Sequence, residues 1–147
     1  GTGNIGGRVV EQMQMFMQVL TYDSLTNTLE ELPALLRQAD VVSLHLPLIP
    51  ETRDFLDAGR LALLRDGTVI VNTARGAVVN EQSLLREIQQ GRLRAAFDVF
   101  WQEPYNGPLA SFHPDRFYMT PHIASTCREF LERTADDLRV FCRKLGQ

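Results

Sequence analysis

The chain has 147 residues, 44% of them hydrophobic, and a formal net charge of −3 at pH 7. This length and this composition favour one compact domain with a substantial core. The slightly acidic balance provides no basic face for nucleic acid or for an anionic membrane, so we expect neither as a partner. Small molecules are the expected ligands.

Cysteine usage and hydropathy bear on the cellular compartment. Cys127 and Cys142 have neither the CxxC spacing nor the neighbouring histidine pair of a zinc site, so we predict no metal centre and interpret both as free thiols. Free thiols favour the cytoplasm, although two cysteines in an exported protein are also able to pair. No apolar run approaches the roughly 20 residues that cross a bilayer, and the chain opens on a glycine-rich turn instead of a signal peptide.

The order of apolar and amphipathic segments predicts the fold class. After a helical stretch through Phe16, runs rich in Val, Ile and Leu alternate with amphipathic segments, which is typical of a parallel sheet covered on both faces. The predicted strands are Val19–Tyr22, Val41–Leu46, Thr68–Asn72, Ala95–Val99 and Phe117–Met119. The predicted helices are Leu29–Gln38, Leu61–Leu64, Glu81–Gln90 (with Asn80 as N-cap and Gly91 as stop) and about Thr126–Leu145. We predict an α/β fold with a doubly wound parallel sheet.

Two stretches that contain proline, Leu46–Glu51 and Glu103–Pro108, are interpreted as loops at strand ends. In an open parallel sheet, ligands bind in the crevice beyond the carboxyl ends of the strands. The residues that directly follow the predicted strands are therefore the candidates for a functional site.

The opening segment GTGNIGG places Gly1, Gly3 and Gly6 in the GxGxxG spacing. This spacing permits a tight turn, a close approach of backbone to a pyrophosphate, and close packing of helix on strand. The motif alone is weak, because glycines take this spacing by chance in many chains. Its context, before a helix and within an α/β pattern, favours a Rossmann-type nucleotide loop.

Asp23 lies 17 residues after Gly6, close to where such folds bind the adenosine ribose hydroxyls. The alternative is that Asp23 is a turn residue beside Ser24. A carboxylate at this place repels a 2′-phosphate, and residues 24–28 contain no arginine to neutralise one. We therefore predict NAD as the cofactor, with NADP less favoured.

A family resemblance is carried by four segments, LHLPLIPETRDFL, VIVNTARGAVVNEQSLL, AAFDVFWQEP and TPHIAS. In this order and spacing they resemble the signatures of the D-isomer-specific 2-hydroxyacid dehydrogenases, and the match spans nearly the whole chain. The resemblance implies that residues 1–147 are an NAD-binding (Rossmann) domain. It also implies an NAD-dependent oxidoreductase that transfers a hydride between NAD(H) and a small D-2-hydroxy acid or 2-oxo acid.

The resemblance assigns a catalytic trio. Arg75 is expected to bind the substrate carboxylate and carbonyl, His122 to transfer a proton, and Glu103 to support that histidine. The chemistry suits these residue types, because histidine exchanges a proton near neutral pH and arginine matches a carboxylate with two parallel donors. Read singly, each residue has a structural alternative: Arg75 as a cap on loop carbonyls, Glu103 as a solvated charge and His122 as a turn residue.

The resemblance also implies the cofactor contacts. The expected cofactor-binding residues are Gly1, Gly3, Asn4, Ile5, Gly6, Asp23, Leu46, Pro47, Thr73, Ala74, Arg75, Asp98 and His122. Asp98 is expected near the nicotinamide carboxamide, with a structural hydrogen bond within the sheet as the alternative. Without motif support, His45 is interpreted as packed in its strand, His113 as a surface-loop residue, and Trp101 as a packing residue.

The chain also departs from the family pattern. We expect the domain to be incomplete at its N-terminus and around residues 16–29, and the isolated chain to turn over little or no substrate, because the cleft's other half normally comes from a substrate domain. A homodimer is expected from the resemblance. The alternative function is an NAD(H)-responsive, corepressor-like binding protein of the same family, since such relatives keep the same trio.

Overall fold

In the computed structural model, residues 1–126, 128 and 132 are described. The helix predicted at Thr126–Leu145 lies outside these residues, apart from its first positions. Within the described ranges no helix is both long enough and apolar enough to cross a membrane.

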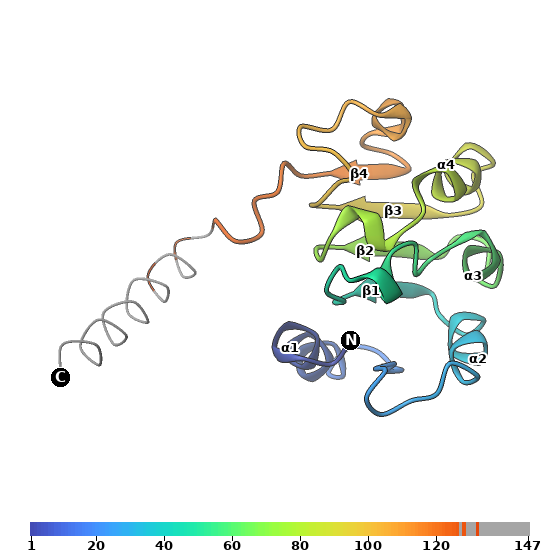
Figure 1. Cartoon of the computed structure of the whole chain (residues 1–147), viewed down its shortest axis with the longest axis vertical. Coiled ribbons are helices and arrows are strands. Elements are labelled where there is room, and N and C mark those ends of the chain that lie inside the picture. The colour runs from blue at the N-terminus through green and yellow to red at the C-terminus, as the bar shows by residue number, and fades with distance from the viewer. Residues whose placement is uncertain (127, 129–131, 133–147) are drawn as a thin grey trace.

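Four parallel strands form the sheet. They are β1 (Val41–Leu44), β2 (Val69–Asn72), β3 (Arg94–Phe97) and β4 (Phe117–Met119), paired in the order β1-β2-β3-β4. Figure 1 shows them stacked in this order, with their carboxyl ends on the same side. The parallel α/β prediction is confirmed, and four of the five predicted strands are present with ends shifted by up to two residues.

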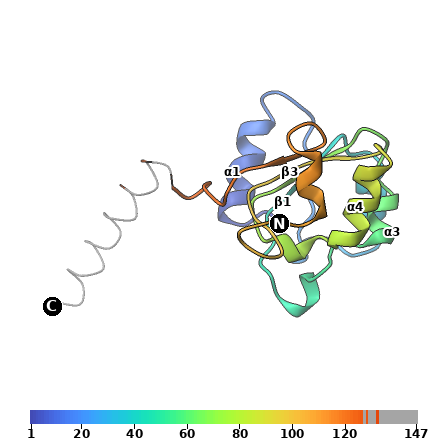
Figure 2. The same ribbon diagram turned by 90° about the horizontal axis from the view of Figure 1, so that it is seen from above.

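The connections between strands contain the helices. These are α2 (Leu32–Leu36), α3 (Ala58–Ala62) and α4 (Glu81–Gln89), with short 3-10 turns at Pro50–Thr52, Gly76–Val78 and Pro108–Phe112. Helices α3 and α4 lie side by side against the sheet (Figures 1 and 2). Both predicted ends of α4 are confirmed: the Asn80 side chain accepts from the Ser83 N–H at 3.0 Å, and Gly91 takes a φ of +71°.

The apolar core lies between this helix pair and the sheet. Its fully buried members alternate along the strands and repeat at helical spacing along α4, as burial of one face requires. They include Leu56, Leu61, Ile70, Leu84, Ile88, Leu93, Phe97, Leu109 and Phe117. The sheet therefore has a rigid, buried centre from which the loops at its carboxyl edge project.

The predicted strand Val19–Tyr22 is wrong. Among the described residues, this segment pairs with no strand. The Gly1 nitrogen donates one hydrogen bond to the Tyr22 carbonyl at 2.9 Å, whereas a strand in a sheet makes a regular series of such bonds with its neighbour. The preceding helix α1 (Asn4–Met13) also ends before Phe16, which is 76% exposed. Residues 15–22 therefore form no strand of the sheet: most of their side chains are exposed, and the half-buried Tyr22 packs against the core from outside the sheet.

The Asn80 cap supports a first prediction. Asn80→Ala removes the acceptor for both the Ser83 N–H and the Ser83 hydroxyl, and should lower the free energy of unfolding by about 1 kcal/mol. Urea denaturation of the two proteins measures this difference. Gln82→Ala, on the exposed face of the same helical turn, is the matched control and should change stability by less than about 0.5 kcal/mol. Equal effects of the two substitutions would contradict the capping role.

Gly76 supports a second prediction. A β-carbon at this position would lie 2.1 Å from the Phe100 carbonyl carbon and 2.5 Å from the Trp101 nitrogen, both of which are backbone atoms. Gly76→Ala should therefore force the two loops apart and cost about 2 kcal/mol, seen as a lower melting temperature. Gly59→Ala is the control, because its β-carbon meets an ordinary contact and alanine favours the helix. A melting temperature unchanged by Gly76→Ala would show that the loops are not packed this closely.

Candidate functional site

The register of the sheet puts four loops in one row. Leu44 pairs with Asn72, Asn72 with Phe97, and Phe97 with Met119, so the last residues of all four strands are neighbours. The segments that follow them contain every residue of the predicted catalytic trio and most of the predicted cofactor contacts. The candidate site therefore lies at the carboxyl edge of the sheet, as expected for this architecture.

The glycine loop packs tightly against the end of β1. A β-carbon on Gly1 would lie 2.5 Å from the His45 carbonyl oxygen, and one on Gly6 would lie 2.0 Å from the Gly1 carbonyl oxygen. By contrast, a β-carbon on Gly3 would meet nothing within 4 Å. Two glycines thus permit close backbone packing, while the third leaves the space in front of α1 open.

That open space is a hollow of about 510 Å³. It collects residues from the glycine loop and from the segments after β1 and β2, which are far apart in sequence. Its lining residues are Gly3, Asn4, Ile5, Gly6, His45, Leu46, Pro47, Leu48, Thr73, Ala74 and Arg75. Nine of the predicted cofactor residues are therefore brought together, whereas Gly1, Asp23, Asp98 and His122 are not among those that line it.

Asp23 lies against the start of the glycine loop. Its Oδ2 accepts hydrogen bonds from the Thr2 N–H at 2.7 Å and from the Thr2 hydroxyl at 3.0 Å, and its Oδ1 accepts from the Leu25 N–H at 3.0 Å. The hydrogen bond from the Thr2 N–H is the main reason that the pKa of Asp23 lies below its ordinary value. The carboxylate is therefore ionised at neutral pH, and it retains acceptor capacity for a further donor.

Arg75 projects from a turn that a buried amide organises. Asn72, the last residue of β2, is fully buried and donates to the Arg75 carbonyl at 3.0 Å, while its Oδ1 accepts from the Ala74 N–H at 3.0 Å. The Arg75 guanidinium is exposed and donates to the Ala74 carbonyl at 2.6 Å. The contact with Ala74 supports the alternative that Arg75 caps loop carbonyls. The exposed guanidinium still has further donors for an anion.

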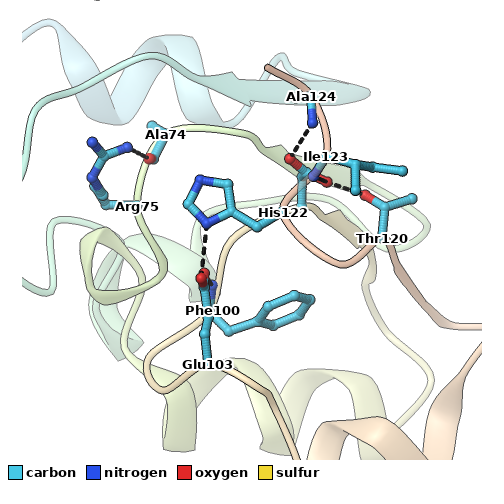
Figure 3. Close-up of polar contacts among 9 residues, drawn as sticks. Ala74, Arg75, Phe100, Glu103, Thr120, His122, Ile123 and Ala124 are labelled. Atoms are coloured by element: carbon cyan, nitrogen blue, oxygen red, sulfur yellow. Dashed lines mark hydrogen bonds and ion pairs between the residues drawn. The ribbon is translucent and has the colours of Figure 1, made fainter. Parts of the chain in front are cut away.

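His122 and Glu103 are in direct contact. The His122 Nδ1 lies 2.8 Å from the Glu103 Oε2, and the second carboxylate oxygen accepts from the Phe100 N–H at 3.1 Å (Figure 3). The hydrogen bond with His122, followed by that from Phe100, lowers the pKa of Glu103. Because an ionised carboxylate only accepts, Nδ1 carries the hydrogen and Nε2 is left to exchange a proton with a ligand.

Asp98 holds the loop on which His122 lies. It is 5% exposed, and its oxygens accept from the Thr120 hydroxyl at 2.5 Å and from the N–H groups of Ile123 and Ala124 at 2.9 Å each. Burial acts to raise the pKa of Asp98, but the hydrogen bonds from Thr120, Ala124 and Ile123 outweigh it and the pKa lies below its ordinary value. Asp98 thus makes structural hydrogen bonds, which is the alternative to a contact with the nicotinamide carboxamide.

A second hollow, of about 480 Å³, lies beside the histidine–glutamate pair. Its lining residues are Phe100, Glu103, Pro104, Tyr105, His113, Met119, Thr120, Pro121 and His122. Arg75 lines the first hollow and the His122–Glu103 pair lines the second, and no hydrogen bond joins Arg75 to the pair in the described residues. The structure therefore unites two members of the predicted trio directly and places the third on the neighbouring loop (Figure 3).

Sequence reasoning missed several participants. The prediction omits Asn72 and Thr120, although Asn72 ends β2 and Thr120 directly follows β4, and a polar residue at a strand end is the signal that could have found them. His45 was interpreted as packed in its strand, but it follows β1, lines the first hollow and lies 2.9 Å from the Ser43 hydroxyl through Nε2. His113 lies in a surface loop as predicted, and it also borders the second hollow.

Trp101 packs, as predicted. Its ring stacks on Phe97 with centroids 5.6 Å apart, and its indole N–H donates to the Val79 carbonyl at 2.7 Å. These contacts join the loop after β3 to the segment after β2, next to the close approach of Gly76. Trp101 thus helps to hold the loop that carries Glu103 against the segment that follows Arg75.

Comparison with known proteins identifies relatives. A glyoxylate reductase from Aeropyrum pernix is 36% identical over 148 residues, covering 92% of this chain and 44% of the relative. A D-lactate dehydrogenase from Aquifex aeolicus, solved with NAD and lactic acid, has a TM-score of 0.82 and 32% identity, over 98% of this chain and 52% of that one. A D-isomer specific 2-hydroxyacid dehydrogenase from Xanthobacter autotrophicus Py2, in complex with NADPH and MES, has a TM-score of 0.72 and 32% identity, over 84% and 43%.

The chain spans about half the length of these relatives. The names of the relatives give no support to the regulatory alternative. The family model described as D-isomer specific 2-hydroxyacid dehydrogenase, NAD binding domain, matches residues 1–124. With the parallel sheet, the glycine loop and the His122–Glu103 pair in place, this match shows that the chain belongs to the D-isomer specific 2-hydroxyacid dehydrogenases, as their NAD-binding domain.

Proposed function

We propose that the full-length protein carrying these residues is an NAD-dependent D-2-hydroxyacid dehydrogenase, working as a 2-oxo acid reductase in the reverse direction. The observation that carries this proposal is the 2.8 Å contact between His122 Nδ1 and Glu103 Oε2, at the edge of the sheet that also holds the glycine loop. Proton transfer to a carbonyl oxygen needs a positioned general acid, and this contact orients the imidazole for that role. The family match supports the same reaction class.

The residues of the first hollow fit a dinucleotide. The open face at Gly3 admits a pyrophosphate against backbone N–H groups at the start of α1, and Leu46 and Pro47 offer an apolar wall for the adenosine side. NADH, when bound, supplies the hydride that reaches the carbonyl carbon of the substrate. The chain's own contribution is to bind and orient the reactants and to deliver a proton.

Each member of the trio has a distinct proposed role. In reduction, His122 donates a proton from Nε2 to the carbonyl oxygen, and it takes the proton back when the hydroxy acid is oxidised. Glu103 keeps the ring in this orientation and favours its charged form. Arg75 pairs with the substrate carboxylate and polarises the carbonyl, because its exposed guanidinium has donors beyond the one used by Ala74.

The cofactor preference rests on Asp23. Its ionised carboxylate is held at the glycine loop by Thr2, where it is available to a ribose hydroxyl and repels a 2′-phosphate. Because a relative in the same family was solved with NADPH, the preference depends on this residue and its neighbours and not on the fold. We propose NAD(H) as the working cofactor.

We propose that residues 1–147 are the NAD-binding part of a longer enzyme, since they correspond to about half the length of the relatives. We also propose that these residues alone turn over little or no substrate. A cytoplasmic homodimer is proposed on the cysteine usage and on the family resemblance. The substrate is a small 2-oxo acid or D-2-hydroxy acid, as the names of the relatives suggest.

The Glu103→Gln variant tests the role of the pair. It should lower kcat for 2-oxo acid reduction by about 100-fold, within the range of general acid–base contributions. Because Glu103 has a lowered pKa, it is ionised across the neutral range and accepts a hydrogen bond from the ring Nδ1. The neutral amide keeps an oxygen acceptor but loses this charge, so the loss should appear in kcat and not in KM for NADH.

Steady-state NADH oxidation across pH 5–10 in the full-length protein provides the measurement. Glu51→Gln removes an exposed carboxylate from a different loop and serves as the control for net charge. A Glu103→Gln enzyme with the kcat of the parent across this pH range would rule out the proposed pairing.

The Asp23→Asn variant tests the cofactor preference. It removes the charge but keeps an oxygen acceptor, and should reduce the ratio of kcat/KM for NADH over NADPH about tenfold, as expected for one charge repulsion at intermediate dielectric. Glu30→Gln, in the following exposed segment, controls for the loss of one negative charge. An unchanged ratio in Asp23→Asn, or an equal change in both variants, would remove Asp23 as the determinant.

A further inference from the structure

The backbone of His122 takes an unusual conformation. Its φ is +54°, in the left-handed region that side chains other than glycine seldom occupy. A residue stays in this region when its surroundings hold it there. The direction of the imidazole toward Glu103 therefore depends on contacts that tie down both flanks of His122.

The Asp98 carboxylate supplies those contacts. It accepts from Thr120 before the histidine, and from Ile123 and Ala124 after it, so one buried side chain bridges the two flanks. Asp98 is itself anchored to the sheet, because its N–H donates to the Asn72 carbonyl at 3.0 Å. The left-handed turn at His122 is thus connected to the ends of β2 and β3.

Thr120 is the donor that completes the bridge on the leading flank. Its N–H donates to the Phe97 carbonyl at 3.0 Å, and its carbonyl accepts from the His122 N–H at 3.0 Å, which places the residue between the sheet and the histidine. Its hydroxyl contacts Asp98, and makes no hydrogen bond to Glu103 or Arg75 in the described residues. Since Thr120 is uncharged, replacing it alters geometry while leaving the charges of Asp98, Glu103 and Arg75 in place.

We propose that Thr120 is a positioning residue: its hydroxyl, through Asp98, holds the backbone turn that directs the His122 imidazole onto Glu103. This inference rests on the proposed function, because it concerns the histidine to which we assign proton transfer. It assigns to Thr120 no contact with substrate or cofactor.

The test compares Thr120→Val, which keeps the shape and removes the hydroxyl, with Thr120→Ser, which keeps the hydroxyl. In the full-length protein, Thr120→Val should lower kcat for 2-oxo acid reduction at least tenfold, while KM for NADH changes less than about twofold. Thr120→Ser should stay within about threefold of the parent. Equal activity of the parent and Thr120→Val, or equal loss in both variants, would overturn the proposal.

A control on the same loop shows whether any lost hydroxyl bond has this effect. Thr126→Val removes a hydrogen bond from the Thr126 hydroxyl to the Ile123 carbonyl and leaves the Asp98 bridge in place. It should preserve kcat, and a loss of kcat equal to that of Thr120→Val would contradict the specific role of Thr120. Thermal melting shows whether each variant is folded. If Thr120→Val is unfolded, the comparison is made between Thr120→Ser and the parent.

A second measurement does not depend on turnover. The change that Glu103→Gln causes in the NMR chemical shift of His122 Nδ1 reports their contact, and it should shrink by at least half when measured in a Thr120→Val background. An undiminished effect would show that Thr120 does not position the ring. If the parent reduces no 2-oxo acid but this contact still depends on Thr120, the proposed function fails while the positioning role stands.

Discussion

The hydrogen-bonded register of four parallel strands is the constraint on which the rest of the molecule depends. Because Leu44, Asn72, Phe97 and Met119 form one row, the chain leaves each strand at the same edge. The core residues behind that row are buried and pack together with residues of the helices. Segments far apart in sequence, such as the glycine loop and the turn at Arg75, then line one hollow.

Buried polar side chains extend this order from the sheet into the loops. Asn72 is the last residue of β2, and Asp98 directly follows β3. The Asn72 amide and the Asp98 carboxylate each form hydrogen bonds with the backbone of a loop at this edge. Leaving such groups unpaired inside the protein costs about 1–3 kcal/mol each, so the loop conformations that satisfy them are strongly favoured. No buried side-chain nitrogen or oxygen lacks a partner within the described residues. The loops that carry Arg75 and His122 are thus positioned by the sheet and not by the ligand.

Much of this arrangement was predictable because it follows from local rules. The apolar runs of β1 to β4, the Asn80 cap and the Gly91 stop each depend on neighbours within a few residues, and the motifs placed the His122–Glu103 pair correctly. The strand expected at Val19–Tyr22 failed because a strand needs a paired neighbour, which local pattern does not reveal. Thr120 was missed for the same reason, since its partner Asp98 follows a different strand. The partners of the Asn72 side chain, Ala74 and Arg75, lie within three residues, so a polar residue at a strand end was the local signal for it.

The central claim is that His122, oriented by Glu103, transfers the proton in an NADH-dependent reduction of a 2-oxo acid. The most direct measurement is NADH oxidation at 340 nm by the full-length protein with glyoxylate, hydroxypyruvate, pyruvate and 2-oxoisocaproate, beside His122→Ala and an NADPH control. The account predicts turnover of at least one of these acids with NADH, and its loss in His122→Ala with NADH binding retained. A folded parent that binds NADH and reduces none of them, or a His122→Ala variant as active as the parent, would contradict it.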